Sequence, residues 1–405
     1  MKHLSVLFVD DQTTLLNAVE RIVRKQAKDW EVFFSDSAAS AIEILDSHRI
    51  NVVVSDMRMP GMDGVELLDY VKDRHPNIIR FILSGYSRTD RTLDAVRVAH
   101  QYFIKPFSTK ELISALELTH TLYKRIRNPG LQSIIASIDR LPTPRKVYYE
   151  ISTELNNPHT TIEKISTIIA SDTAISGKVL QVVNSAFFGR SQRVDSIDES
   201  VGILGLEAVK SLVLVAGIAS DHKEILNGLI SIDLYSKHCM EVALICKWIA
   251  REIGLTAPQR DTLFTVGLLH DIGKLILIKK YSEFYLEKGW KENPYETKLH
   301  INQIEKLADE HAAIGAALIA LWGIPTQVVN TIAFYSDPAE NENDEDHFSC
   351  ILHVADGISN YLHVGNETPF IESDAIDLRS LEASGFDYPI DQWFAEIKEN
   401  GVEQV

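Results

Sequence analysis

The first 127 residues alternate between short apolar runs and longer stretches in which apolar residues recur three or four positions apart. Short runs rich in β-branched residues are typical of buried strands, and the wider spacing is typical of helices. The predicted strands are 4–9, 31–34, 51–55, 79–83 and 102–104, and the predicted helices are 14–25, 38–47, 64–73, 88–99 and 110–127. This alternation with short loops predicts an α/β fold with a doubly wound, five-stranded parallel sheet.

The pattern becomes helical beyond residue 130 and stays so up to residue 336. The helices predicted there are 145–155, 161–170, 173–184, 196–204, 206–220, 233–253, 259–278 and 309–321. Helical patterns without strand alternation predict an all-α domain. The proline-containing segments 128–130 and 141–144 interrupt the helical patterns, so we expect the boundary between the two folds near them.

Residues 336–346 contain six acidic and no basic residues, which predicts a solvated loop that carries no chemistry. A last helix is predicted at 348–362. The expected organisation is an α/β domain at 1–126, a linker or helix at 127–140, an all-α domain at 141–335, an acidic loop at 336–346, and a helical segment at 347–405 that packs on the all-α domain.

Composition narrows the class of protein. The 45% hydrophobic content suffices for packed cores, and the net charge of −17 without a Lys/Arg cluster disfavours direct nucleic-acid binding. No apolar segment reaches the ~18 residues of a membrane span, and the apolar N-terminus is too short for a signal peptide. Cys239, Cys246 and Cys350 have no metal-site spacing and are expected to be small buried residues. A cytoplasmic location is expected.

Polar residues follow four of the predicted strands: the pair Asp10 and Asp11, then Asp56, Ser84 and Lys105. The carboxyl ends of parallel strands meet at one edge of a sheet, so these side chains are expected to converge. Converging carboxylates need a cation, and hard oxygen ligands suit Mg²⁺. Asp56 is then a nucleophile, and Lys105 and Ser84 can contact phosphoryl oxygens. The alternative is a set of ordinary polar residues at loop edges.

These residues resemble the receiver domain of two-component response regulators, over about residues 1–126. The resemblance implies that Asp10 and Asp11 are the acidic pair, Asp56 the phosphoacceptor, and Ser84, Tyr102 and Lys105 the switch residues. It further implies that Mg²⁺ is bound by Asp10, Asp11 or both, by Asp56 and by the main-chain carbonyl of Arg58. The implied partner is a sensor histidine kinase or phosphotransfer protein that donates the phosphoryl group.

The second half resembles the HDOD domain over about residues 131–335. The resemblance is carried by the segments Leu-Pro-Thr-Pro at 141–144, Ser-Asp-Thr-Ala at 171–174, Val-Asn-Ser-Ala-Phe-Phe-Gly at 183–189 and Leu-Gly-Leu-Glu-Ala-Val at 204–209. HDOD domains are related to the HD phosphohydrolases, are regarded as non-catalytic, and act as output or adaptor modules in bacterial signalling.

Four residues complicate that interpretation: His238, His270, Asp271 and Asp356 reproduce the order in which HD phosphohydrolases hold a metal. Histidine and aspartate from three segments could bind a single transition-metal ion, which would acidify a water molecule for phosphoester attack. In the alternative, His270 and Asp271 cap a helix junction and hydrogen-bond one another, while His238 and Asp356 are packing or surface residues. Both interpretations stay open here.

A second metal site, as found in HD-GYP phosphodiesterases, is not expected, because Ala-Phe-Tyr-Ser-Asp-Pro stands at 333–338. Lys274 and His311 are expected to contact a ligand rather than to catalyse. The expected function is a response regulator in which phosphorylation of Asp56 controls an HDOD module that binds a protein or ligand. The alternative is a receiver-regulated, metal-dependent phosphohydrolase acting on a nucleotide or phosphoester. The downstream partner is not identifiable from sequence, and homodimerisation stays open.

Overall fold

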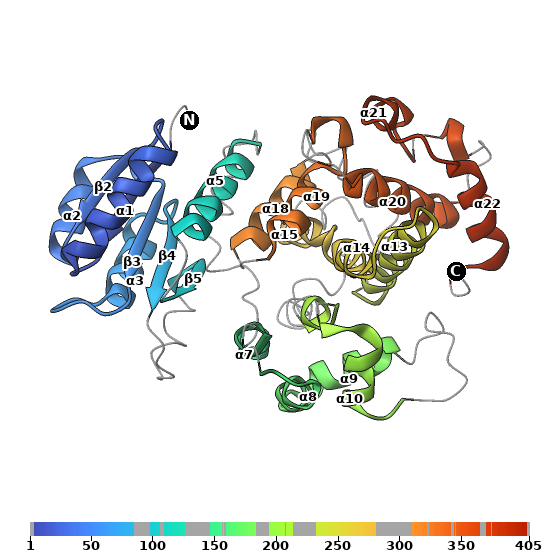
Figure 1. Cartoon of the computed structure of the whole chain (residues 1–405), viewed down its shortest axis with the longest axis horizontal. Helices are drawn as coiled ribbons and strands as arrows, with labels where there is room; N and C mark the ends of the chain where they lie inside the picture. The colour runs from blue at the N-terminus through green and yellow to red at the C-terminus, as the bar shows by residue number, and fades with distance from the viewer. Residues whose placement is uncertain are drawn as a thin grey trace. The chain divides into compact units, whose positions relative to one another are not determined.

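The computed structural model describes residues 4–84, 98–105, 109–125, 146–183 except 156 and 158, 194–213 except 207, 232–280, 310–341 except 322–323, 344–364 except 345, and 370–402 except 374 (Figure 1). The chain divides into two compact units. The first is Met1–Leu141 with Ala317–Thr326, and the second is Pro142–Ala316 with Gln327–Val405.

The first unit is built on a parallel sheet with the strand order β2-β1-β3-β4-β5. Its strands are β1 (Ser5–Val9), β2 (Glu31–Ser35), β3 (Val52–Asp56), β4 (Ile79–Ser84) and β5 (Gln101–Ile104). Every pair of neighbouring strands is parallel, with Val6 of β1 opposite Val52 of β3. All residues of β1, β3 and β4 are buried, as expected for strands covered on both faces. The predicted parallel α/β sheet is confirmed.

The helices described in this unit are α1 (Thr13–Gln26), α2 (Ala38–Ser47), α3 (Gly64–Arg74) and α5 (Thr109–Arg125). One core joins Leu7, Val53 and Ile82 of the sheet to buried residues of α2 and α3. Side chains alternate along a strand, so Val6 and Phe8 point to the opposite face, where α1 and α5 contact one another. Most of the helix predicted at 88–99 lies outside the described residues.

The second unit is helical throughout its described residues, as predicted. Its helices are α7 (Lys146–Leu155), α8 (Ile162–Ala170), α9 (Thr173–Val183), α10 (Ile197–Leu204), α13 (Ile232–Glu252), α14 (Ala257–Leu269), α15 (Ile272–Lys280), α19 (Thr326–Phe334), α20 (Phe348–Val364), α21 (Leu378–Ala383) and α22 (Ile390–Asn400). Helix α18 (Glu310–Leu321) begins in this unit, and its residues from Ala317 onward are assigned to the first. Helices α7 to α10 pack on one another, while α13 packs against both α14 and α20. The second of these groups positions the polar centre described below.

One predicted helix is wrong: the single helix at 259–278 is broken in the structure. Helix α14 ends at Leu269, α15 begins at Ile272, and His270 with Asp271 forms the turn between them. Residues 263–278 are buried without interruption, so no solvent-facing side of a helix remains for the sequence pattern to report. For this reason the sequence pattern did not indicate the break at the His-Asp pair.

The described residues of the acidic segment, 336–341, 344 and 346, include regular structure where a solvated loop was expected from the composition. Pro338–Glu340 forms a short 3₁₀ helix, η4. The backbone N–H groups of Phe348 and Ser349 each donate to the carboxylate of Asp344 at 2.8 Å. Burial raises the pKa of Asp344 although these hydrogen bonds act in the opposite direction. Asp344 thus accepts hydrogen bonds from the first two backbone amides of α20.

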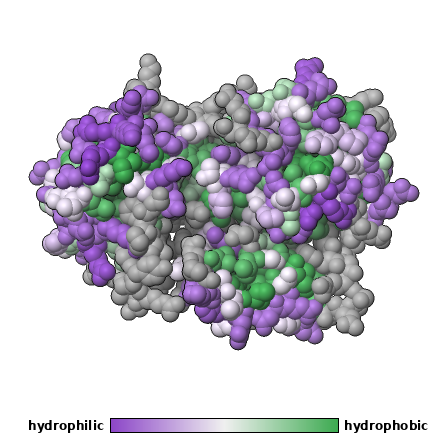
Figure 2. Space-filling model, in the orientation of Figure 1, coloured by the Kyte–Doolittle hydropathy of each residue, from purple (hydrophilic) through white to green (hydrophobic). Residues whose placement is uncertain are grey.

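Among the described residues, no helix is both long and apolar enough to cross a membrane. On the face drawn in Figure 2, hydrophilic residues gather over α1 and α2 of the first unit. This agrees with the exposed positions along α1, among them Arg21, Arg24 and Lys25.

Candidate functional site

Asp56 is the last residue of β3, where its side chain is 9% exposed. The backbone N–H of Arg58 donates to its Oδ2 at 2.9 Å. Helix α3 begins directly behind this loop at Gly64, where a Cβ would lie only 1.9 Å from the carbonyl oxygen of Asp56. Glycine at this position therefore lets the start of α3 approach the backbone of the strand end. The sheet and α3 together fix the position of the Asp56 carboxylate.

Lys105, which follows β5, joins Asp56 to Asp10. Its Nζ lies 2.5 Å from Oδ1 of Asp56 and 2.8 Å from Oδ2 of Asp10. Partial burial alone lowers the pKa of Lys105, but the hydrogen bonds to Asp10 and Asp56 outweigh burial and raise that pKa. The structure thus brings two buried carboxylates around one cation at the carboxyl edge of the sheet.

The other residues expected to form the receiver site, Asp11, Ser84 and Tyr102, differ in their exposure and contacts. Asp11 is exposed, beside the buried Asp10. The hydroxyl of Ser84 donates to Sδ of Met57 at 3.1 Å, and its carbonyl accepts from the backbone N–H of Lys105 at 2.6 Å. Tyr102 lies in β5, but its side chain is outside the described residues.

The buried carboxylates of Asp10 and Asp56 offer only oxygen atoms as ligands, and such ligands fit Mg²⁺.

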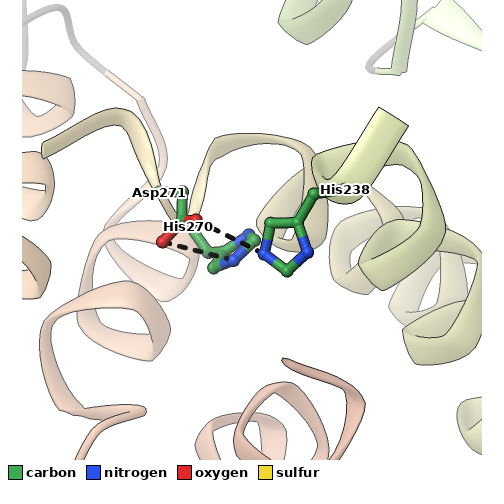
Figure 3. Close-up of side chains that lie close together, drawn as sticks. All are labelled: His238, His270 and Asp271. Carbon is green, nitrogen blue, oxygen red and sulfur yellow. Dashed lines mark ion pairs between the residues drawn. The ribbon is translucent and has the colours of Figure 1, made fainter. Parts of the chain in front are cut away.

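A second polar centre lies inside the helical unit, between α13, the α14–α15 turn and α20 (Figure 3). Nε2 of His238 is 3.4 Å from Oδ2 of Asp271 and 3.3 Å from Oδ1 of Asp356. Nε2 of His270 is 3.4 Å from Oδ1 of Asp271 and 3.6 Å from Oδ1 of Asp356. All four residues are at most 4% exposed. His238 and Asp356 are therefore buried beside His270 and Asp271, and the interpretation of them as surface residues is wrong.

A hydrogen bond orients the imidazole of His270. Nδ1 of His270 lies 2.6 Å from the carbonyl oxygen of Gly267, which can only accept, so Nδ1 carries a proton. In its neutral form His270 therefore directs the lone pair of Nε2 toward the two aspartates. This Nε2 and Oδ1 of Asp271 are buried and make no hydrogen bond within the described structure.

The donor set fits a metal ion. Ligand atoms of His238, His270 and Asp271 all lie within 4.8 Å of one another. The nitrogen–oxygen separations in this centre are 3.3–3.6 Å, and Oδ2 of Asp271, the oxygen nearest to His238, is also the one that Lys274 contacts. Imidazole nitrogens with carboxylate oxygens suit a transition-metal ion.

Opposite charges inside this centre shift one another's pKa values. Burial alone lowers the pKa of His238, but contacts with Asp271 and Asp356 raise it to about 8. Burial would raise the pKa of Asp271, but His270 and Lys274 hold it well below its ordinary range. Nζ of Lys274 lies 2.6 Å from Oδ2 of Asp271, leaving Oδ1 directed toward His270.

His311 and Tyr335 lie beside the same centre. Nε2 of His311 lies 2.7 Å from the hydroxyl oxygen of Tyr335 and 3.6 Å from Oδ1 of Asp271. The ring of Tyr335 meets that of His270 edge-on, with centroids 5.7 Å apart. Burial raises the pKa of Tyr335 well above its ordinary range, so the hydroxyl stays protonated at neutral pH.

Sequence reasoning missed several residues that support the centre: Glu241, Tyr335, Ser359, Asn360 and His363. The amide nitrogen of Asn360 donates to Oδ1 of Asp356 at 2.7 Å. On α20 the polar residues Asp356, Ser359, Asn360 and His363 are spaced at helical intervals within an apolar sequence. That spacing is the signal from which a polar stripe facing the centre could have been predicted.

Comparisons with known proteins agree with this two-part architecture. A model of the response regulator receiver domain matches residues 6–117, and a model of the HDOD domain matches residues 141–338. The DNA-binding transcriptional regulator NtrC of Proteus hauseri is 29% identical over 154 residues, 36% of this chain and 32% of NtrC. An uncharacterized protein of Treponema pallidum is 27% identical over 212 residues, 50% of this chain and 39% of that protein.

Among solved structures, an HDOD domain protein of Geobacter sulfurreducens is similar over 72% of this chain and 96% of its own, with a TM-score of 0.46 and 19% identity. The chain spans about a third of the length of the curated relatives it matches. The fold and the family matches define a protein with a receiver module followed by a helical output module. The chain contains a response regulator receiver domain at residues 6–117, followed by an HDOD domain at residues 141–338.

Proposed function

We propose that this protein is a phosphorylation-controlled response regulator in which Asp56 accepts a phosphoryl group and the HDOD domain delivers the output by binding a partner or ligand. The observation that supports it best is the joint contact of Lys105 with Asp56 and Asp10 at the carboxyl edge of the sheet. Receiver domains act with a histidine kinase or phosphotransfer partner, so the donor belongs to that class. The proposal includes a cytoplasmic location and the domain boundaries expected from sequence.

In this reaction a carboxylate oxygen of Asp56 attacks phosphorus, an acyl phosphate forms, and the donor leaves with the electron pair of the broken bond. Asp10, Asp11, Asp56 and the carbonyl of Arg58 would bind Mg²⁺, which neutralises charge on the phosphoryl oxygens. Lys105 is placed to pair with one of those oxygens. Ser84 and Tyr102 are proposed to respond to the new group as switch residues.

The test uses the full-length chain with acetyl phosphate and Mg²⁺. Mass spectrometry is expected to find one added phosphoryl group in the wild type and none in Asp56→Asn. Asp69→Asn, an exposed aspartate on α3, is the matched control and is expected to be phosphorylated normally. Wild-type incorporation in Asp56→Asn would refute the assignment.

A second candidate for the output is a metal-dependent phosphohydrolase that acts on a nucleotide or phosphoester. It is favoured by one observation, the buried Nε2 of His270 and Oδ1 of Asp271 that lack hydrogen bonds. His238, His270, Asp271 and Asp356 would hold the ion, which would acidify a bound water molecule. Lys274 and His311 would contact a ligand phosphate.

Both candidate functions of the HDOD domain are compatible with a bound metal, so metal content must be measured together with hydrolysis to tell the binding module from the phosphohydrolase. Protein purified without chelators is analysed for transition metals and incubated with a panel of nucleotides and phosphoesters. Metal without hydrolysis supports the binding module. Hydrolysis that disappears in His270→Ala supports the phosphohydrolase.

A further inference from the structure

A series of hydrogen bonds leads from the buried imidazole of His238 to the surface. Nδ1 of His238 is 3.1 Å from Oγ of Ser359, which is 3.0 Å from Oε2 of Glu241. The same Oε2 is 2.8 Å from Nε2 of His363, whose side chain is 29% exposed. Ser359 is fully buried and Glu241 is 5% exposed. The series alternates between α13 and α20 and ends at solvent.

The direction of each hydrogen bond follows from the donors available. A carboxylate only accepts, so Ser359 donates its single hydroxyl proton to Glu241. The oxygen of Ser359 can then only accept from His238, and Nδ1 of His238 must carry a proton. In the neutral ring, Nε2 is therefore the nitrogen with the lone pair, and it lies 3.3–3.4 Å from Asp356 and Asp271.

We propose that Ser359 and Glu241 are positioning residues that select the Nδ1–H tautomer of His238 and so keep its Nε2 available to a divalent transition-metal ion. This inference rests on the metal-binding role proposed for the buried centre. His363 fixes Glu241 from the surface side, because its Nε2 reaches both carboxylate oxygens, at 3.1 and 2.8 Å.

The opposite tautomer would be favoured without this pair. Two carboxylates beside Nε2 attract a proton to that nitrogen, and a proton there would block metal binding. An acceptor at Nδ1 offsets this preference. His270 has an equivalent arrangement, with the carbonyl of Gly267 as the acceptor of its Nδ1 proton. Outer groups that orient a ligating histidine in this way typically change metal affinity about 10–100-fold when they are replaced.

The experiment uses the full-length protein labelled with ¹⁵N-histidine. Nitrogen spectra of the metal-free protein, recorded as a pH series, report the tautomer of each neutral imidazole, and His238→Gln identifies the His238 signals. We expect Nδ1–H in the wild type. Ser359→Ala, which removes the acceptor, is expected to shift His238 toward Nε2–H. Glu241→Gln introduces an amide N–H that can donate to Ser359 and reverse the hydroxyl, so the same shift is expected.

Affinity for Mn²⁺ is measured on the same variants by titration calorimetry. Ser359→Ala and Glu241→Gln are expected to weaken binding about 10–100-fold, and Ser359→Thr, which keeps the hydroxyl, is expected to restore it. Ser349→Ala, a buried serine on α20, and Glu252→Gln, an exposed glutamate on α13, are matched controls expected to leave tautomer and affinity unchanged.

The two readouts separate the positioning role from the metal role. If the wild-type protein binds no Mn²⁺, the metal-binding role fails, while the tautomer still decides whether Ser359 and Glu241 control His238. A wild-type His238 in the Nε2–H form overturns the proposal, as do variants that keep the wild-type tautomer. If Ser359→Ala does not fold, as judged by circular dichroism, the outcome for Glu241→Gln decides.

Discussion

The ammonium group of Lys105 lies 2.5 Å from Oδ1 of Asp56, the carboxylate oxygen at the end of the central strand β3. The same ammonium also contacts Asp10, so one lysine neutralises two buried carboxylates that would otherwise repel one another. Its contact with Asp56 couples the stability of the receiver domain to the residue proposed to be phosphorylated.

Replacing Lys105 by alanine is therefore expected to destabilise the receiver domain when Mg²⁺ is absent. The loss of the cation leaves Asp10 and Asp56 buried without their common partner, at a cost of about 1–3 kcal/mol. Mg²⁺ can replace the lost charge, so the free energy of unfolding should rise more with added Mg²⁺ in the variant than in the wild type. Urea titrations with and without MgCl₂ measure both effects. Lys28→Ala, at an exposed position, is the control, and an equal response to Mg²⁺ in Lys105→Ala and wild type would contradict the prediction.

A second prediction concerns the contact between α15 and α18. A Cβ on Gly273 would lie 1.9 Å from the carbonyl oxygen of His311 and 2.8 Å from the amide nitrogen of Gly315. Gly273→Ala must therefore separate the two helices, and we expect destabilisation of about 1–3 kcal/mol. Gly202→Ala in α10 meets nothing within 4 Å and is expected to be neutral or stabilising by up to about 1 kcal/mol. Chemical denaturation of both variants tests this contrast, and equal stabilities would show that the helices are not in close contact.

The thiol of Cys350 predicts how stability depends on pH. Burial raises its pKa from 9.0 to about 12. Below about pH 9 the thiol is protonated in both the folded and the unfolded protein. At higher pH the unfolded chain loses the proton while the folded protein keeps it, so this group makes stability fall as pH rises toward 12.

Cys350→Ala removes that contribution. Between about pH 8 and about pH 10 the wild type should lose about 1.4 kcal/mol more unfolding free energy than the variant. Urea titrations at both pH values under reducing conditions provide the comparison. Parallel losses in the two proteins would mean that the Cys350 thiol is accessible to ionisation in the folded state.

The sequence was most informative where one physical rule links pattern to position. Asp56 follows an apolar strand, and parallel strands place their carboxyl ends at one edge, so its meeting with Asp10 and Lys105 could be predicted. The break at His270 could not, because the surrounding residues are buried on every side. The contact of Glu241 with Ser359 joins residues 118 positions apart on two helices. Such a contact depends on how α13 rotates against α20, which no local pattern records.

The same limit applies to Tyr335, which stands where the sequence departs from the Gly-Tyr-Pro segment of two-metal phosphodiesterases. In the structure its hydroxyl oxygen lies within hydrogen-bond distance of Nε2 of His311, at 2.7 Å, and its ring packs edge-on against the ring of His270. Within the described part of the chain, a single group of three His, Cys, Asp or Glu residues has ligand atoms close enough to share an ion. Two-metal catalysis requires ions about 3.5–4 Å apart, and one such group does not supply ligands for both.

We therefore expect the HDOD domain not to hydrolyse cyclic di-GMP, even when it is loaded with metal. A single ion could bind a phosphate together with Lys274, whose ammonium already lies beside Asp271, but it would not stabilise both the attacking and the leaving oxygen. Protein incubated with Mn²⁺ and cyclic di-GMP is analysed by chromatography for linear product, with an active two-metal phosphodiesterase as the positive control. Tyr335→Phe, which removes the hydroxyl that contacts Nε2 of His311 and keeps the aromatic ring, tests the role of that hydroxyl. If the wild type hydrolyses cyclic di-GMP and His270→Ala does not, the HDOD domain is an enzyme and not only a binding module.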